Sequence, residues 1–65
     1  MFIQIKDLIT GQIYDVNANQ ICCFTRASNN VGVTMYQIIL TNNIVIVVTH
    51  KRWNKIKRII SSNFI

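Results

Sequence analysis

Residues 38–60, IILTNNIVIVVTHKRWNKIKRII, contain the change of pattern that decides the fold. The first half of this stretch is almost continuously apolar and rich in β-branched side chains, which is typical of a buried strand. From about His50 onward the period changes, because Trp53, Ile56 and Ile60 recur at helical spacing. The sequence therefore predicts a buried strand that leads directly into an amphipathic helix.

The predicted helix covers residues 50–63, and Phe64 would extend its apolar stripe by one turn. Thr49 is a suitable N-cap, although no acidic residue follows three positions later to complete a capping box. Basic residues in the first turn oppose the helix dipole, at a cost of a few tenths of a kcal/mol each. An anionic partner would offset that cost.

Alternating apolar and polar residues precede this stretch and predict a mainly β fold. We expect Tyr36, Ile38 and Leu40 to share one face of a strand. Gly11 can adopt the positive φ of a hairpin turn, and Asn42–Asn43 fits a two-residue type I′ turn. Five short antiparallel strands, in a sheet or a small open barrel followed by one C-terminal helix, are expected at residues 2–6, 12–17, 21–26, 34–41 and 44–48.

The last of these strands, residues 44–48, is apolar at every position, which predicts cover on both faces. The helix would provide one cover, and a second subunit or the far wall of a barrel would provide the other. Residues 27–32 (ASNNVG) are expected to form a turn or an exposed loop.

The length of the chain allows one small domain, residues 1–65, with a thin core. A domain of this size buries only about 60% of the surface that its unfolded chain exposes. The composition is 51% hydrophobic and only 14% charged, which is too apolar for disorder. Self-association into a homo-oligomer is the expected way to cover the remaining apolar surface.

Cys22 and Cys23 are adjacent, so in a regular strand they would point to opposite faces, and neighbouring cysteines rarely form a disulfide with each other. We expect two small buried residues with free thiols in a reducing, cytoplasmic environment. Neither a signal peptide nor a membrane-spanning segment is expected, because the longest unbroken apolar run covers only residues 44–48.

The basic residues are strongly clustered, since five of the seven lie near the C-terminus and the net charge is +5. No glutamate is present to pair with them, which favours an anionic partner over a merely solvated helix face. Trp53 would then belong to the core or stack on a base. The candidate anion-binding residues are Lys51, Arg52, Lys55 and Arg58, with Arg26 added if the helix packs near it.

Nothing in the sequence predicts catalysis, a metal or a cofactor. His50 is the only histidine, which favours a plain helix-start residue over a metal ligand or a catalytic base. Asp7 and Asp15 could form a carboxylate pair, but charged residues are also routine on strand edges. Tyr14 and Tyr36 are expected to be half-buried in the sheet.

Two stretches resemble the small flagellar FlbD-type proteins. In LITGQIYDVNANQI the similarity lies at Leu8, Tyr14, Val16, Asn17 and Ile21, with Gly11 one residue later than in the family. YQIILTNNIVIVV is similar to the second hairpin of that family, with an asparagine at position 43 where glycine is usual. A LytTR-type DNA-binding domain is also similar in its strands followed by a helix. Both resemblances imply a non-catalytic β-rich module.

Two classes of function therefore stay open. The first is an oligomeric module that binds nucleic acid or an anionic nucleotide-type ligand between subunits. The high frequency of isoleucine and asparagine would suit an AT-rich phage genome, in which such a protein could sequester its ligand. The second is a structural or protein–protein interaction module, as the flagellar resemblance implies.

Overall fold

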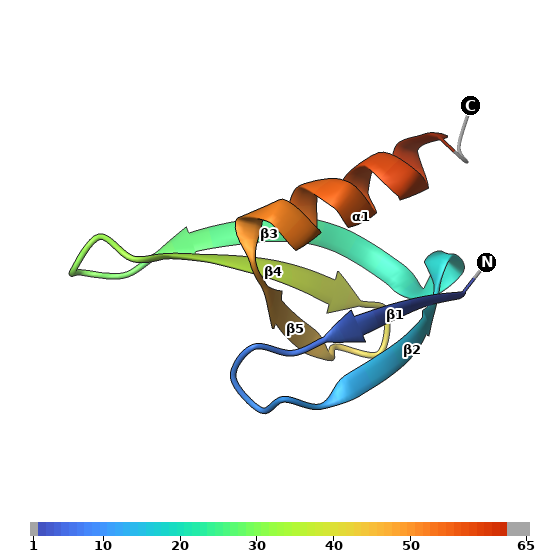
Figure 1. The fold of residues 1–65 in the computed structure, drawn as a ribbon, viewed down its shortest axis with the longest axis horizontal. Helices are drawn as coiled ribbons and strands as arrows, with labels where there is room; N and C mark the ends of the chain where they lie inside the picture. Colours follow the sequence, from blue (N-terminus) through green and yellow to red (C-terminus); the bar gives the residue numbers. More distant parts are fainter. Residues whose placement is uncertain (1, 63–65) are drawn as a thin grey trace.

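A computed structural model describes residues 2–62 and shows five strands followed by one helix (Figure 1). The strands form two antiparallel sheets, β1–β2 and β3–β4–β5, so the predicted mainly β fold with a C-terminal helix is confirmed. Within residues 2–62, no helix is long and apolar enough to cross a membrane. The elements are β1 (Phe2–Lys6), β2 (Ile13–Asn17), the short 3₁₀ helix η1 (Ala18–Gln20), β3 (Ile21–Ser28), β4 (Thr34–Leu40), β5 (Val45–Val48) and α1 (His50–Ser62).

The turn between β1 and β2 is built around Asp7. Its buried carboxylate accepts hydrogen bonds from the backbone N–H groups of Ile9 (2.7 Å) and Thr10 (3.1 Å). Gly11 has a φ of +75°, as predicted, and its N–H donates to the Asp7 carbonyl. Asp15 lies on β2 opposite Gln4 and is exposed. One aspartate therefore organises a turn while the other faces solvent, and they do not act as a carboxylate pair.

The three-stranded sheet differs from prediction at both of its turns. β3 continues to Ser28, so the β3–β4 loop is shorter than predicted, and the side chain of Asn29 holds it by accepting two backbone hydrogen bonds. Between β4 and β5, Leu40 pairs with Ile44, which leaves a three-residue loop. Only Asn43 in that loop has a positive φ (68°), whereas a type I′ turn needs two such residues.

A β-bulge interrupts the pairing of β3 with β4, because Ile21 pairs with Leu40 and Cys23 with the adjacent Ile39. Cys22 is therefore the extra residue. The core residue Leu40 is on the inner side of the sheet, so Ile21 points inward and Cys22 and Cys23 both point outward. The prediction that the two cysteines face opposite ways was wrong, because it assumed a regular strand. The prediction that both are buried was also wrong, since Cys22 is exposed and Cys23 is half-buried.

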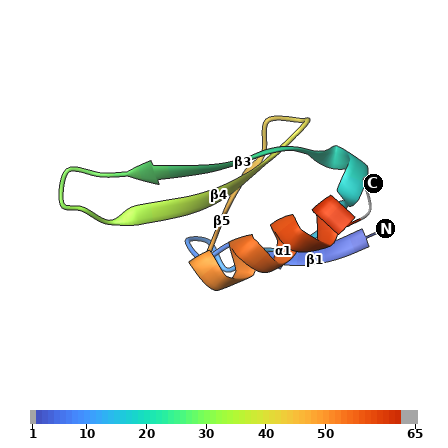
Figure 2. The ribbon, with the colours of Figure 1, turned by 90° about the horizontal axis from the view of Figure 1, so that it is seen from above.

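The two sheets and the helix enclose one core. The Leu8 N–H donates to the Val47 carbonyl (2.8 Å), which brings the end of β1 against β5. In the view from above, α1 overlaps β1, and a hydrogen bond from the Arg52 side chain to the Gln4 carbonyl joins the two elements (Figure 2). The largest fully buried side chains come from five different elements, which shows that the core needs all of them together. They are Ile5, Val16, Ile38, Ile46 and Ile56.

The helix has the predicted orientation. Thr49 caps it, since its hydroxyl accepts a 3.2 Å hydrogen bond from the Arg52 N–H. Trp53 is buried, and its indole N–H donates to the Gln37 carbonyl on β4 (3.2 Å). Ile56 and Ile60 complete the buried stripe. The remaining part of the prediction, residues 63 and 64, lies outside the described residues.

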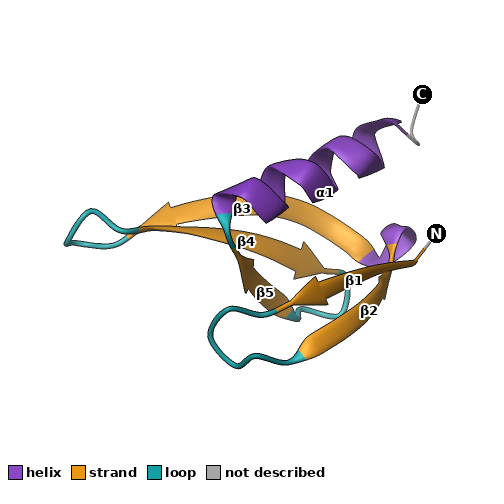
Figure 3. Cartoon of the chain, in the orientation of Figure 1, coloured by secondary structure: helices purple, strands orange, loops and turns teal. Residues whose placement is uncertain are grey.

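Cover on β5 is less complete than predicted. Ile46, Val47 and Val48 are buried, but Val45 is 44% exposed on the side away from the helix. The β3–β4 hairpin extends beyond the rest of the protein (Figure 3). The structure as a whole, with the hairpin included, measures 37 × 24 × 19 Å. Val31 and Val33 lie in the loop at the tip of this hairpin and are exposed. The described chain therefore keeps substantial apolar surface in contact with solvent.

Candidate anion-binding surface

The packing of α1 determines where its basic residues point. Because Trp53, Ile56 and Ile60 face the core, residues about half a turn away on the helix must face solvent. Lys51, Lys55 and Arg58 occupy those positions, and all three are exposed. The structure therefore brings three of the predicted anion-binding residues together on the outward face of one helix.

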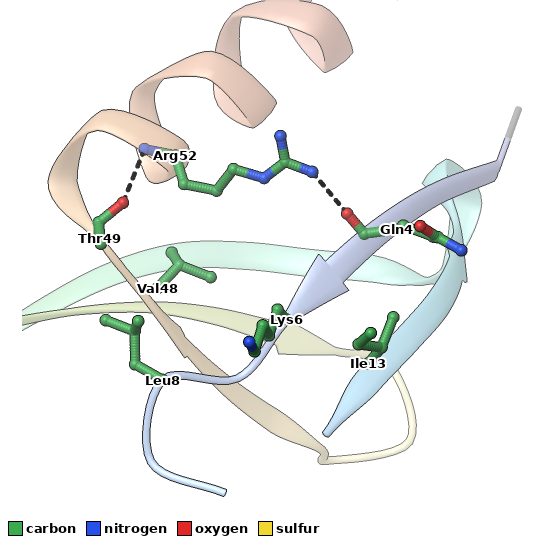
Figure 4. Close-up of a pocket in the computed structure, with 7 residues that line it drawn as sticks. All are labelled: Gln4, Lys6, Leu8, Ile13, Val48, Thr49 and Arg52. Carbon is green, nitrogen blue, oxygen red and sulfur yellow. Dashed lines mark hydrogen bonds between the residues drawn. The ribbon is translucent and has the colours of Figure 1, made fainter. Parts of the chain in front are cut away.

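Arg52 differs from these three residues because it is half-buried and held in place. Its guanidinium donates a 2.7 Å hydrogen bond to the Gln4 carbonyl on β1 (Figure 4). This contact joins the first turn of α1 to the edge of β1. It also directs a guanidinium, which has further N–H donors available to an anion, toward the groove beside that edge.

A hollow of about 290 Å³ lies between the start of α1 and the β1–β2 hairpin (Figure 4). Its basic groups are Arg52 and Lys6, a residue that sequence reasoning did not select. The signal that could have identified Lys6 is its alternation with buried Ile5, which places it on the outer face of β1. The hollow is lined by Gln4, Lys6, Leu8, Ile13, Val48, Thr49 and Arg52.

Two further hollows continue from the first along α1. One, of about 210 Å³, is lined by Thr49, Lys51, Arg52 and Lys55. The other, of about 600 Å³, is lined by Lys51, Asn54, Lys55, Arg58 and Ile59. Arg52 is shared by the first two hollows, and Lys51 and Lys55 by the last two. We name this continuous surface the basic track, and it comprises Lys6, Arg52, Lys51, Lys55 and Arg58.

The acidic residues do little to neutralise the basic track. Helix α1 carries no acidic residue, and the Asp7 carboxylate is buried in its turn. Asp15 pairs with Gln4 across the hairpin, so it shares the outer face of β1–β2 with Lys6 and lowers the positive potential there. The positive potential should therefore be strongest along α1 and weaker toward the β1–β2 end.

The other two basic residues, Lys57 on α1 and Arg26 on β3, lie outside the basic track. The Lys57 ammonium is 4.7 Å from the centre of the Trp53 ring, a cation–π contact. Arg26 is exposed on β3 opposite Tyr36, and the half-buried Tyr36 ring stacks on His50 at 4.5 Å. Neither Arg26 nor Lys57 lines any of the three hollows. The structure thus places Arg26 apart from the other four predicted residues.

His50 is the first residue of α1, as expected, and its Nε2 is 2.9 Å from the amide nitrogen of Asn54. Trp53 lies in the core, where Phe24 meets it edge to face at 6.1 Å. Its burial favours the core role over base stacking, because a buried ring has no free face for a ligand. Among residues 2–62, no group of three or more potential metal ligands is found.

Comparison of the chain with known protein families, characterised proteins and solved structures finds no match. The resemblance to FlbD-type proteins and the fainter one to LytTR-type domains stay predictions. The basic track is therefore the feature of the described residues that indicates a function.

Proposed function

We propose that this protein is a non-catalytic binding module whose basic track contacts the phosphate backbone of a nucleic acid. The observation that carries the proposal is the continuity of the basic track, in which three adjoining hollows share their basic residues. A chain of evenly spaced phosphates matches such a surface, because each phosphate can meet a different Lys or Arg.

The sizes of the hollows favour a polyanion over a single small nucleotide. Ligand pockets that enclose drug-sized molecules are usually about 300–1,000 Å³. The hollow beside β1, of about 290 Å³, is at the lower limit of this range, so its size allows only a small ligand. The hollow of about 600 Å³ is large enough, but all its described lining residues lie on α1, and one face of a single helix cannot enclose a ligand. A strand that lies along the surface needs no enclosure.

The basic track also accounts for an unfavourable feature of the helix. Lys51 and Arg52 lie in its first turn, where the helix dipole disfavours cations. The bond from Arg52 to Gln4 offsets part of this cost, but exposed Lys51 makes no comparable contact among the described residues. Phosphates that bind along the basic track would supply the missing negative charge.

Two double variants with equal charge change test the proposal. Lys51→Glu/Lys55→Glu alters the basic track, whereas Arg26→Glu/Lys57→Glu alters the two basic residues outside it. Fluorescence anisotropy with a labelled 20-nucleotide single strand at low salt measures the affinity of each. The first variant should bind at least about tenfold more weakly, since it loses two phosphate contacts and adds repulsion. The control should stay within about threefold of the wild type.

Circular dichroism would show that both variants keep the fold. Equal weakening by the two variants would mean that only net charge matters and would refute a localised site. If the wild type does not bind oligonucleotides at low salt, the nucleic-acid proposal is wrong. The alternative of a protein–protein interaction module would then be favoured, and its binding should depend little on salt.

We further propose that the protein is a homo-oligomer and acts in the cytoplasm. Exposed apolar side chains outside the basic track support self-association, because Ile9, Val31 and Val33 are each more than half exposed. Light scattering over a range of concentrations tests this. A mass of one chain at all concentrations would contradict it, while leaving the basic track unaffected. Free thiols are consistent with a reducing cytoplasm.

A further inference from the structure

The bulge in β3 creates a feature that a regular strand would not have. Cys22 and Cys23 lie side by side on the outer face of the three-stranded sheet, away from α1. Cys22 is exposed, Cys23 is half-buried, and neither is in a disulfide. Ile39 pairs with Cys23 across the strands, so the second thiol has an apolar neighbour. An accessible pair of thiols thus stands at the open edge of the sheet.

The two thiols belong to adjacent residues, whose Cα atoms are about 3.8 Å apart, and the bulge directs both side chains to the same face. Partial burial raises the pKa of the Cys23 thiol, and a hydrogen bond to Cys22 together with the charge of that neighbour raises this pKa further. Both sulfur atoms can therefore approach one and the same ligand atom.

An internal disulfide is a poor outcome for this pair. Disulfides usually join Cα atoms about 4.4–6.8 Å apart, whereas adjacent Cα atoms across a trans peptide are about 3.8 Å apart. No cis peptide bond occurs in the described chain. A ligand atom that bridges the two sulfurs avoids this constraint, since two bonds to a metal are longer than one S–S bond.

The number of ligands restricts the choice of metal. Structural zinc and iron–sulfur centres take four protein ligands. Within residues 2–62 no group of three or more His, Cys, Asp or Glu side chains is available to complete such a set. Cu(I) prefers soft thiolates and does not require four ligands. The pair therefore fits a soft ion of low coordination number.

We propose that Cys22 and Cys23 form a bidentate thiolate site for one Cu(I)-class ion per chain. Binding breaks two S–H bonds, forms two metal–sulfur bonds and releases two protons to the solvent, with no change in oxidation state. Because binding releases protons, the apparent affinity should increase from pH 6 to pH 9. The site lies on the opposite side of the sheet from α1 and is independent of the basic track.

The test is an anaerobic titration in which reduced protein competes with a chromophoric chelator for Cu(I). The wild type should remove one ion per chain from the chelator. Cys22→Ser and Cys23→Ser should each weaken binding about 10²–10⁴-fold. Each variant keeps one thiolate and loses the second, which the chain holds at a high effective concentration beside the ion.

A geometric control keeps two thiols but separates them. Cys22→Ser/Ala27→Cys places the second thiol at an exposed position on the same strand, about 13 Å from Cys23 at about 3.3 Å per residue. It should bind as weakly as the single variants. Trp53 fluorescence would show that every variant folds. Wild-type affinity in the control or in either single variant would overturn the proposal, and so would one ion per two chains.

Discussion

Replacement of Ile56 by alanine would test whether α1 is an integral part of the domain. The Ile56 side chain is fully buried where the helix meets the sheets. The substitution removes three carbon atoms, which costs about 2.4 kcal/mol at about 0.8 kcal/mol per buried carbon group. The cavity left behind can increase the cost to about 5 kcal/mol. A domain of 65 residues has a total stability of only about 3–10 kcal/mol.

The expected result is a fall in melting temperature of at least about 10–20 °C, since the cost of about 2.4 kcal/mol alone corresponds to this range at about 4–8 °C per kcal/mol in a domain of this size. Ile9→Ala is the matched control, because it deletes the same atoms from a side chain that is 68% exposed. Trp53, the only tryptophan, lies in the same interface and reports unfolding in urea. Equal melting temperatures for the two variants would refute the packing of α1 on the sheets.

Substitutions at three other positions test separate parts of the structure. Asp7→Ala should lower the free energy of unfolding by about 1–3 kcal/mol, because two turn amides lose their acceptor; an unchanged urea midpoint would contradict this. Asn43→Ala should lower the free energy of unfolding by about 1–2 kcal/mol, because Asn43 has a positive φ that alanine adopts only with strain. Asn43→Gly should lower it less, and equal losses would argue against the left-handed conformation. Asp15→Asn should strengthen oligonucleotide binding about two- to fivefold at low salt by removing a negative charge near Lys6, and weaker binding would contradict the proposed position of the strand.

Periodicity was sufficient to predict the order and type of the five strands and of α1, but it did not predict the 3₁₀ helix η1. The stripe of Trp53, Ile56 and Ile60 fixed which face of the helix is buried, and alternation fixed the inward faces of the strands. Thr49 and Gly11 were recognised because capping and positive φ depend on local chemistry. These features need only neighbours in the sequence, which explains why they could be predicted.

Features that depend on pairing between distant residues could not be predicted. The bulge that turns Cys22 to the same side as Cys23 arises from the register with β4, which no local pattern encodes. The hydrogen bond from Arg52 to Gln4 joins residues 48 positions apart, so the contribution of β1 to the basic track could not be predicted from the sequence. Arg26 was grouped with the helix by charge, but it lines none of the three hollows of the basic track.

The salt dependence of oligonucleotide binding tests the central claim most directly. Each phosphate contact with a single strand contributes about −0.7 to the slope of log K against log salt concentration, so five contacts along the basic track predict a slope of about −3.5. In Lys51→Glu/Lys55→Glu the slope should fall in magnitude to about −2, whereas Arg26→Glu/Lys57→Glu should keep the wild-type slope. A wild-type slope near zero, or the same slope in both variants, would contradict a backbone-binding track on α1.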